Sequence, residues 1–288
     1  MRTSVDPGLV KRLSFYASAA SVFSVMVGLL VLAGWTFHIM GLITWGGATP
    51  MAPNAAISLT LAGASLWLLR NNGAQSRDAL SQLAGKIAAA MVTLIGSITL
   101  AEHLFSWDLH IDRLLVVTPP TPGVAAARVL MSPVAALIFL LLGPALLTID
   151  WRTRRGDWPS QFLSLGAMMA SAFGLLGLIL GPSVTPITLA LPAELSYLLI
   201  TSGIVASRPD WALGGLLVSQ NSGARLFRRG VPAALLVLGA VGFILSKFLL
   251  TEAHLTWVEV SAIAVASGIA LAGFTAWMAF AVERGAVE

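Results

Sequence analysis

The chain contains no cysteine, and its four histidines are scattered along the sequence. The lack of cysteine excludes disulfides, thiol catalysis and cysteine-ligated metal or iron–sulfur sites. No two histidines have the i, i+4 spacing that places a metal-binding pair on one helix face, so the sequence indicates no metal site and names no cofactor. The patterns typical of phosphate-binding loops, zinc hydrolases and serine hydrolases are also missing. We therefore predict that the protein is not an enzyme.

Charge is also scarce. Charged residues make up 10% of the 288 residues and hydrophobic residues 57%, and the mean hydropathy is +0.86. Soluble domains average about 25% charged residues, so this composition predicts a polytopic membrane protein. The isoelectric point of about 10.1 does not indicate nucleic-acid binding, because the basic residues form no contiguous patch.

The apolar residues fall into eight segments, most of them near the length of about 20 residues that a helix needs to cross a bilayer. The segments are Leu13–Met40, Asn54–Leu69, Ile87–Phe105, Pro133–Ile149, Phe162–Gly181, Ile187–Ala206, Val231–Leu250 and Val258–Val282. The second and fourth are short, so we expect them to cross without tilt or to begin in the interface. The predicted fold class is therefore all-α, with eight transmembrane helices.

Basic residues set the predicted orientation. All 17 lysines and arginines except Arg113, Arg128 and Lys247 fall on one side of this eight-span arrangement. The positive-inside rule makes that side cytoplasmic and places both termini there. In a bacterium, the location would be the inner membrane. The first segment is too long for the apolar core of a signal peptide, so we expect it to be retained as a span.

The sequence repeats itself. Met51-Ala-Pro-Asn-Ala-Ala, which leads to Gly63, returns as Met131-Ser-Pro-Val-Ala-Ala, which leads to Gly143; Leu191-Pro-Ala-Glu, leading to Gly203, is a weaker third copy. Each unit is an outgoing helix, an outer loop and an ingoing helix, so the copies are parallel. This repetition serves either function or packing alone.

We predict one integral membrane domain over residues 1–288: a cytoplasmic start (1–12), three helix-pair repeats (13–206), an interfacial cytoplasmic loop (207–230) and a final helix pair with a cytoplasmic end (231–288).

Glu194 is the acidic residue that the prediction places deepest in a span. It lies about eight residues into the segment Ile187–Ala206, roughly 12 Å along the helix. A carboxyl group at that depth is usually paired, protonated or functional. Lys247 is a candidate ion-pair partner by depth. The pair would fix helix register, or Glu194 would contact a ligand or take part in proton-linked sensing.

The remaining polar side chains that could form a site gather on the predicted outer side. All four histidines lie there, with several tryptophans and acidic residues. Two interpretations stay open: a shallow outward-facing site, or interfacial anchors and solvated loop residues. The residues that we select as candidates for a sensing surface are Trp107, Asp108, Asp112, Glu194 and His254.

One stretch carries a family resemblance. Phe105-Ser-Trp-Asp-Leu-His-Ile-Asp-Arg-Leu-Leu115, together with Met51-Ala-Pro-Asn and Met131-Ser-Pro, resembles the multi-helix membrane module at the N-terminus of bacterial sensor histidine kinases and of signalling proteins with PAS or diguanylate cyclase domains. Ala206-Ser-Arg-Pro-Asp210 is similar to that module too, and the resemblance spans about residues 13–284. It implies a sensory input function, although no kinase, PAS or cyclase sequence occurs within these residues.

Three functions therefore remain. The first is a membrane-embedded sensory input module, and the second is a structural or accessory subunit of a larger membrane complex. The third, a transporter or membrane enzyme, is disfavoured by the few polar residues in the spans. The expected partners are the lipid bilayer and either other membrane subunits or a second copy, docked through the small residues Ala264, Gly268 and Ala272 of the last span. We expect no nucleic-acid partner.

Overall fold

The computed structural model describes residues 7–47, 49–70, 78–105, 131–151, 159–180 and 190–208, together with Gly230, and throughout these ranges the regular structure is helical. The predicted all-α class is therefore confirmed for them. The helices are α1 (Pro7–Phe37), α2 (Met40–Thr44), α3 (Pro53–Leu69), α4 (Ala79–Phe105), α6 (Pro133–Leu147), α7 (Pro159–Leu180) and α8 (Leu191–Ala206). The last two predicted spans lie outside the described residues.

Proline sets where the second helix of each pair begins. Pro53, Pro133 and Pro192 all stand in the first turn of their helices, where the missing backbone N–H costs no hydrogen bond. In α6, the Ser132 hydroxyl oxygen also accepts a hydrogen bond from the Ala135 N–H and caps the helix. The predicted starts of α3 and α6 are therefore correct to within one residue.

The first predicted segment, Leu13–Met40, is not one continuous helix, and this boundary was wrong. Helix α1 ends at Phe37, and His38 adopts a left-handed backbone conformation with φ 60°. The Ile39 N–H then bonds back to the Gly34 carbonyl oxygen at 2.8 Å, which closes the end of the helix before the short α2 begins. Histidine tolerates this conformation better than most side chains, but its sequence carries no strong stop signal.

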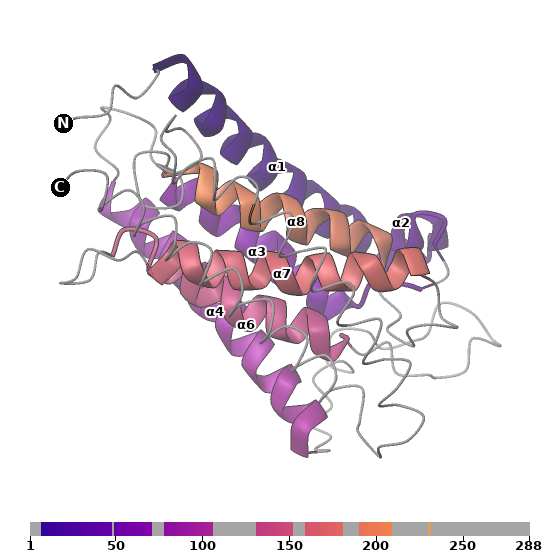
Figure 1. The fold of residues 1–288 in the computed structure, drawn as a ribbon. Coiled ribbons are helices and arrows are strands. Elements are labelled where there is room, and N and C mark those ends of the chain that lie inside the picture. The colour runs from indigo at the N-terminus through magenta and orange to yellow at the C-terminus, as the bar shows by residue number, and fades with distance from the viewer. Residues whose placement is uncertain are drawn as a thin grey trace.

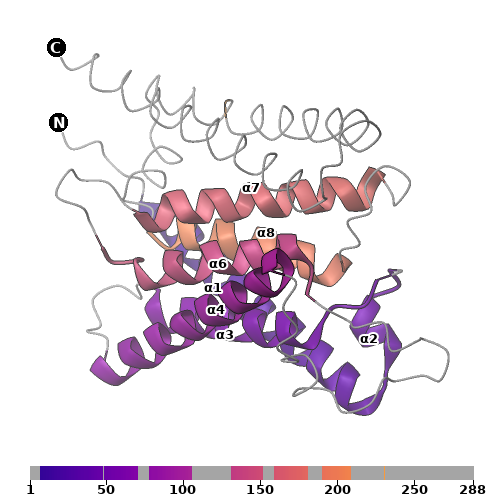
Figure 2. The same ribbon diagram turned by 90° about the horizontal axis from the view of Figure 1, so that it is seen from below.

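The long helices form a closed ring in which each helix contacts its neighbours in the order α1, α3, α4, α6, α7, α8 and back to α1. Across the ring, α3, α6 and α8 contact one another. These three are therefore the inner helices, and α1, α4 and α7 lie outside them. Figures 1 and 2 show the helices side by side in one bundle, with α2 at one end.

The first two helix pairs cross at matched glycines. A methyl group at Gly28 of α1 would lie 2.7 Å from the Ala56 carbonyl oxygen of α3, and one at the matched Gly96 of α4 would lie 3.0 Å from the Ala136 carbonyl oxygen of α6. Both helices therefore approach backbone to backbone, a contact that only a missing side chain permits.

Glycines on the inner helices repeat this relation. A methyl group at Gly63 would lie 2.8 Å from the carbonyl oxygen of Ser21, and one at Gly143 would lie 2.9 Å from that of Ala89. The glycines that the two sequence copies share thus make the same interhelical contacts in both pairs. This duplication has a packing role, whatever else it serves.

A side-chain hydrogen bond is repeated in the same two pairs, near the C-terminal ends of α1 and α4. The Trp35 indole N–H donates to the Met51 carbonyl oxygen at 2.9 Å, and the Nε2 atom of His103 lies 2.8 Å from the Met131 carbonyl oxygen. Trp35 and His103 occupy matched positions near the ends of α1 and α4. Each bond connects the end of one helix to the residues that precede the next inner helix, and so holds the two ends of the intervening loop together.

The third pair, α7 and α8, is held together differently. Gly203 of α8 faces Ala20 and Leu66, on α1 and α3, and not α7. Hydroxyl groups bridge α7 to α8 instead: Ser164 donates to the Thr201 carbonyl oxygen at 2.6 Å, and Ser171 donates to the Glu194 carbonyl oxygen at 3.3 Å. Side-chain hydrogen bonds therefore connect α7 to α8, whereas glycines mark the crossings of the other two pairs.

Among the described helices, two are long and apolar enough to cross a membrane, Gly8–Phe37 and Ala79–Phe105. The three inner helices are apolar but shorter, so the predicted count of eight spans is not supported by these lengths. The apolar windows of the two long helices are only 39% and 33% buried, whereas the core helix of a soluble protein would be mostly buried. Their exposed apolar surface is compatible with membrane insertion.

Candidate functional site

Glu194 is the one predicted sensing residue that the described ranges contain. Trp107, Asp108, Asp112 and His254 lie outside the described residues, as does Lys247, the predicted ion-pair partner. Neither a shared outer sensing surface nor the Glu194–Lys247 pair is therefore tested.

Glu194 stands in the first turn of α8 and not two turns into the helix as predicted. The difference arises because Pro192 favours a helix start, and Ala190 before it is extended, with φ −82° and ψ 129°. The side chain is fully buried, with 0% exposure. Glu194 is thus nearer the start of its helix than its place in the apolar segment suggests, but it is not solvent-exposed.

A small polar cluster surrounds this carboxyl group. The Ser171 hydroxyl of α7 donates to Glu194 Oε2 at 3.2 Å. Tyr197, one helical turn further along α8, is also fully buried, and its ring packs edge-on against Phe139 of α6 with centroids 5.1 Å apart. Glu194 Oε1 and the Tyr197 hydroxyl are both buried, and neither has a hydrogen-bond partner in the part of the chain that the structure describes. The cluster therefore lies where α6, α7 and α8 meet.

Both described histidines have structural roles. His38 is exposed and forms the left-handed turn after α1, while His103 bonds to the Met131 carbonyl oxygen. His110 and His254 lie outside the described residues. The His103 bond is a structural contact, and the two interpretations of the histidines stay open.

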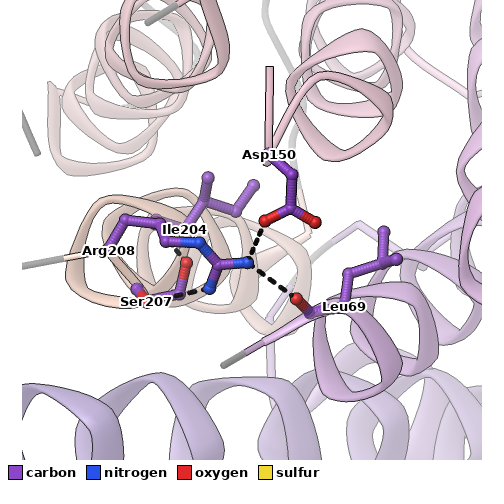
Figure 3. Close-up of polar contacts among 5 residues, drawn as sticks. All are labelled: Leu69, Asp150, Ile204, Ser207 and Arg208. Carbon is purple, nitrogen blue, oxygen red and sulfur yellow. Dashed lines mark hydrogen bonds and ion pairs between the residues drawn. The ribbon is translucent and has the colours of Figure 1, made fainter. Parts of the chain in front are cut away.

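A second polar cluster occupies the opposite end of the inner helices (Figure 3). Arg208 follows the end of α8, and only 5% of it is exposed. One guanidinium nitrogen, Nη2, forms an ion pair with Asp150, just beyond α6, and donates to the Leu69 carbonyl oxygen at the end of α3 at 3.1 Å. The other, Nη1, donates to the Ser207 carbonyl oxygen at 3.1 Å. One cation therefore ties together the C-terminal ends of all three inner helices.

The physical reason for this arrangement is the charge of helix ends. The last carbonyl groups of a helix carry partial negative charge and lack intrahelical donors, so a guanidinium group beside them is stabilised. Arginine suits the place because its planar fork can donate in several directions at once. The Asp150 side chain remains 45% exposed, so this ion pair is open to water on one side.

Neighbouring residues extend this second polar cluster around Arg208. Gln161, in the first turn of α7, donates to the Arg208 carbonyl oxygen at 3.4 Å. Arg70, directly after α3, stacks on the Trp67 ring at 3.4 Å from its centroid. Burial lowers the pKa of Arg70, but an arginine stays charged throughout the physiological range. Through Gln161, the α7 helix is also connected to Arg208.

The two clusters share one helix. Glu194 begins α8 and Arg208 follows its end, about four turns or roughly 20 Å away at 1.5 Å per residue. Each contacts other elements through polar side chains: Glu194 contacts α7, while Arg208 reaches the ends of α3 and α6. A displacement of α8 along its axis would therefore be felt at both ends.

Sequence reasoning placed Arg208 among the basic residues that set topology and missed its bonding. The available signal was the proximity of Arg208, Asp150 and Leu69 to the ends of three repeated inner helices. Because the repeat makes these three helices parallel, those positions would have predicted that the C-terminal ends of the inner helices meet.

The described residues contain no group of three histidine, aspartate or glutamate side chains that could hold a metal ion. The chain matches no protein-family model, no curated protein and no solved structure.

Proposed function

We propose that this protein is a membrane-embedded sensory input module of the bacterial inner membrane. It would span the bilayer eight times, with both termini cytoplasmic, as three parallel helix pairs followed by a final hairpin. The ring of described helices would supply the first six spans. In this orientation, Glu194 lies near the outer face and the Arg208 cluster near the cytoplasmic face.

Exposed apolar side chains support the membrane location. Along α4, Leu80, Leu83, Ile87, Met91 and Leu94 are each 47–76% exposed, and α1 presents a similar row that includes Phe15, Met26 and Leu29. Hydrocarbon chains are the partner that suits two such long rows on the outer helices of one ring. The polar and charged side chains that the structure does bury, by contrast, face other helices.

The observation that carries the sensory proposal is that α8 joins two buried polar clusters at opposite ends of the bundle. Buried polar groups are costly in an apolar interior and are retained where they specify structure or function. In the proposed mechanism, a shift of α8 by about 1–2 Å, the size of known helix shifts in switching proteins, would change the polar contacts at both ends. The resemblance to sensor kinase modules agrees with this role.

The alternative is a structural or accessory subunit of a larger membrane complex. It is favoured by the close glycine crossings of the first two pairs, since rigid packing suits a scaffold. Rigid packing alone does not require the hydrogen bonds between α7 and α8, so we prefer the sensory function.

A chimera tests this choice. Residues 1–288 would be joined in frame to the cytoplasmic core of a histidine kinase, and autophosphorylation measured in right-side-out vesicles while the outer medium is varied in pH, salt and small solutes. The sensory proposal predicts at least one outer condition that changes phosphorylation. It also predicts that Arg208→Ala abolishes the response, whereas Arg12→Ala, on the exposed start of α1, preserves it.

Constant phosphorylation under all outer conditions, together with stable copurification of the native chain with other membrane proteins, would favour the accessory function. Folding of each variant would be checked by size-exclusion chromatography in detergent, so that a misfolded variant is not counted as a lost response.

A further inference from the structure

Two buried oxygen atoms in the first two turns of α8 have no hydrogen-bond partner among the described residues. They are Glu194 Oε1 and the Tyr197 hydroxyl oxygen, and both side chains are 0% exposed. Residues three apart on a helix share one face, so these two groups are neighbours. An unsatisfied buried polar atom costs about 1–3 kcal/mol, and native proteins rarely keep two side by side. The arrangement therefore indicates a species that these oxygens bind.

The number of ligands limits what that species can be. The cluster offers the Glu194 carboxyl group, the Ser171 hydroxyl and the Tyr197 hydroxyl. Ca²⁺ takes six to eight oxygen ligands and Mg²⁺ takes six, so a divalent ion does not fit so few oxygens. A proton needs only one carboxylate oxygen and a neighbouring acceptor, and the cluster supplies both.

Among the described residues, the helices packed against α8 place no cationic side chain beside Glu194. Helices α3, α6 and α7, which pack against α8, carry no titratable side chain between their first and last residues. On α1, Lys11, Arg12 and Tyr16 lie at the inner end, where Tyr16 bonds to Ser202, two turns away from Glu194. His38, beyond the outer end of α1, is exposed. Tyr197 is thus the titratable neighbour within the bundle, and Lys247 lies outside the described residues.

We propose that Glu194 is a reversible proton-binding site reached from the outer face. Water at the outer side gives a proton to the carboxylate, which becomes a neutral carboxyl group, and the reverse step returns it. The ionised group accepts the hydrogen bond from Ser171 and has a free oxygen for one from Tyr197, whereas the neutral group can donate a bond through its own O–H. Since Ser171 belongs to α7, the exchange of partners changes the contact between α7 and α8. That protonation is the sensed stimulus rests on the proposed sensory function; the proton site itself does not.

Infrared difference spectroscopy of the full chain in lipid nanodiscs tests the site. Spectra would be recorded between mildly acidic and mildly alkaline pH, in light and in heavy water. We expect a protonated-carboxyl band that appears on acidification and is lost in Glu194→Gln. The matched control is Glu102→Gln, which removes another buried acid on α4 and should leave that band in place. A band that persists in Glu194→Gln would overturn the proposal.

A second variant guards against a folding defect in Glu194→Gln. Tyr197→Phe keeps the carboxyl group but removes its neighbouring hydroxyl, so the band should remain and shift in frequency, because the protonated carboxyl group loses a polar neighbour. An unmoved band would place Tyr197 outside the site and contradict the proposed cluster. Replacing choline chloride by sodium chloride at fixed pH should have no effect, since a band that sodium diminishes would identify a metal-cation site instead.

These results are independent of the chimera. A titrating band in a chain whose chimera never responds would keep the proton site and remove the sensory function. A responsive chimera whose carboxyl band is indifferent to Glu194→Gln would keep the sensory function and remove protonation of Glu194 as its stimulus.

Discussion

At the scale of single residues, most buried serines and threonines bond to carbonyl oxygens of their own helix, and a smaller set of polar side chains bonds to another helix. Arg208 has the widest reach of them, because it contacts the ends of α3 and α6 as well as its own helix. Sequence reasoning could identify Glu194 from its apolar surroundings. It could not predict the role of Arg208, since an arginine beyond a span satisfies the positive-inside rule whether or not it is buried.

Replacing Arg208 with alanine should destabilise the bundle by about 2 kcal/mol. The Leu69 carbonyl oxygen and Asp150 lose a charged donor, but Asp150 is partly exposed, so water solvates the remaining charge. The stability of Arg208→Lys should fall between those of the unchanged protein and Arg208→Ala, because an ammonium group keeps the charge and loses the planar fork. Unfolding in mixed micelles measures both. Arg12→Ala should change stability by less than about 0.5 kcal/mol, and an equal loss in that control would contradict the assigned role.

The tryptophan that ends the first helix should contribute through its one hydrogen bond. Trp35→Phe keeps an aromatic ring but leaves the Met51 carbonyl oxygen buried without its donor, which predicts a loss of about 1 kcal/mol or more. The same micelle unfolding assay applies. Trp151→Phe, at a position 60% exposed, is the matched control, and a larger effect there than at Trp35 would argue against this bond.

At the scale of helices, the repeated sequence predicted much of what is observed. The starts of α3 and α6 follow from proline, and the shared glycines mark the helix crossings. The starts of α4 and α8 were misplaced by eight and four residues. Hydropathy detects the part of a helix that suits lipid, but α4 begins in the more polar stretch before Ile87 and is stabilised there by contacts such as Gly85 with Leu69.

Glycine at the crossings should be hard to replace. Gly28→Ala would place a methyl group against the Ala56 carbonyl oxygen, and Gly96→Ala would do so at Ala136, so each should cost about 1–3 kcal/mol. Gly41→Ala is the control, because nothing lies within 4 Å of the added methyl group. If all three substitutions had the same effect on unfolding, close backbone packing would not be what holds these pairs.

At the scale of the whole molecule, the long helices of the described residues form a ring of three pairs whose inner helices converge on Arg208. The order of the pairs around the ring could not be derived from hydropathy, which gives spans but not their neighbours. The orientation of the ring in a bilayer still depends on the distribution of basic residues. The proposed sensory role depends on that orientation, because it makes Glu194 outer and Arg208 cytoplasmic.

Thiol accessibility on the cysteine-free chain tests the proposed orientation in the bilayer. Single cysteines would replace Phe37, at the end of α1, and Trp151, beside Asp150; these positions are 71% and 60% exposed. The vesicles would be right-side-out, and the maleimide reagent membrane-impermeant. The account predicts that Phe37→Cys reacts in intact vesicles and that Trp151→Cys reacts only after permeabilisation. Reaction of both cysteines from the same side, or recovery of the protein in the soluble fraction, would contradict it.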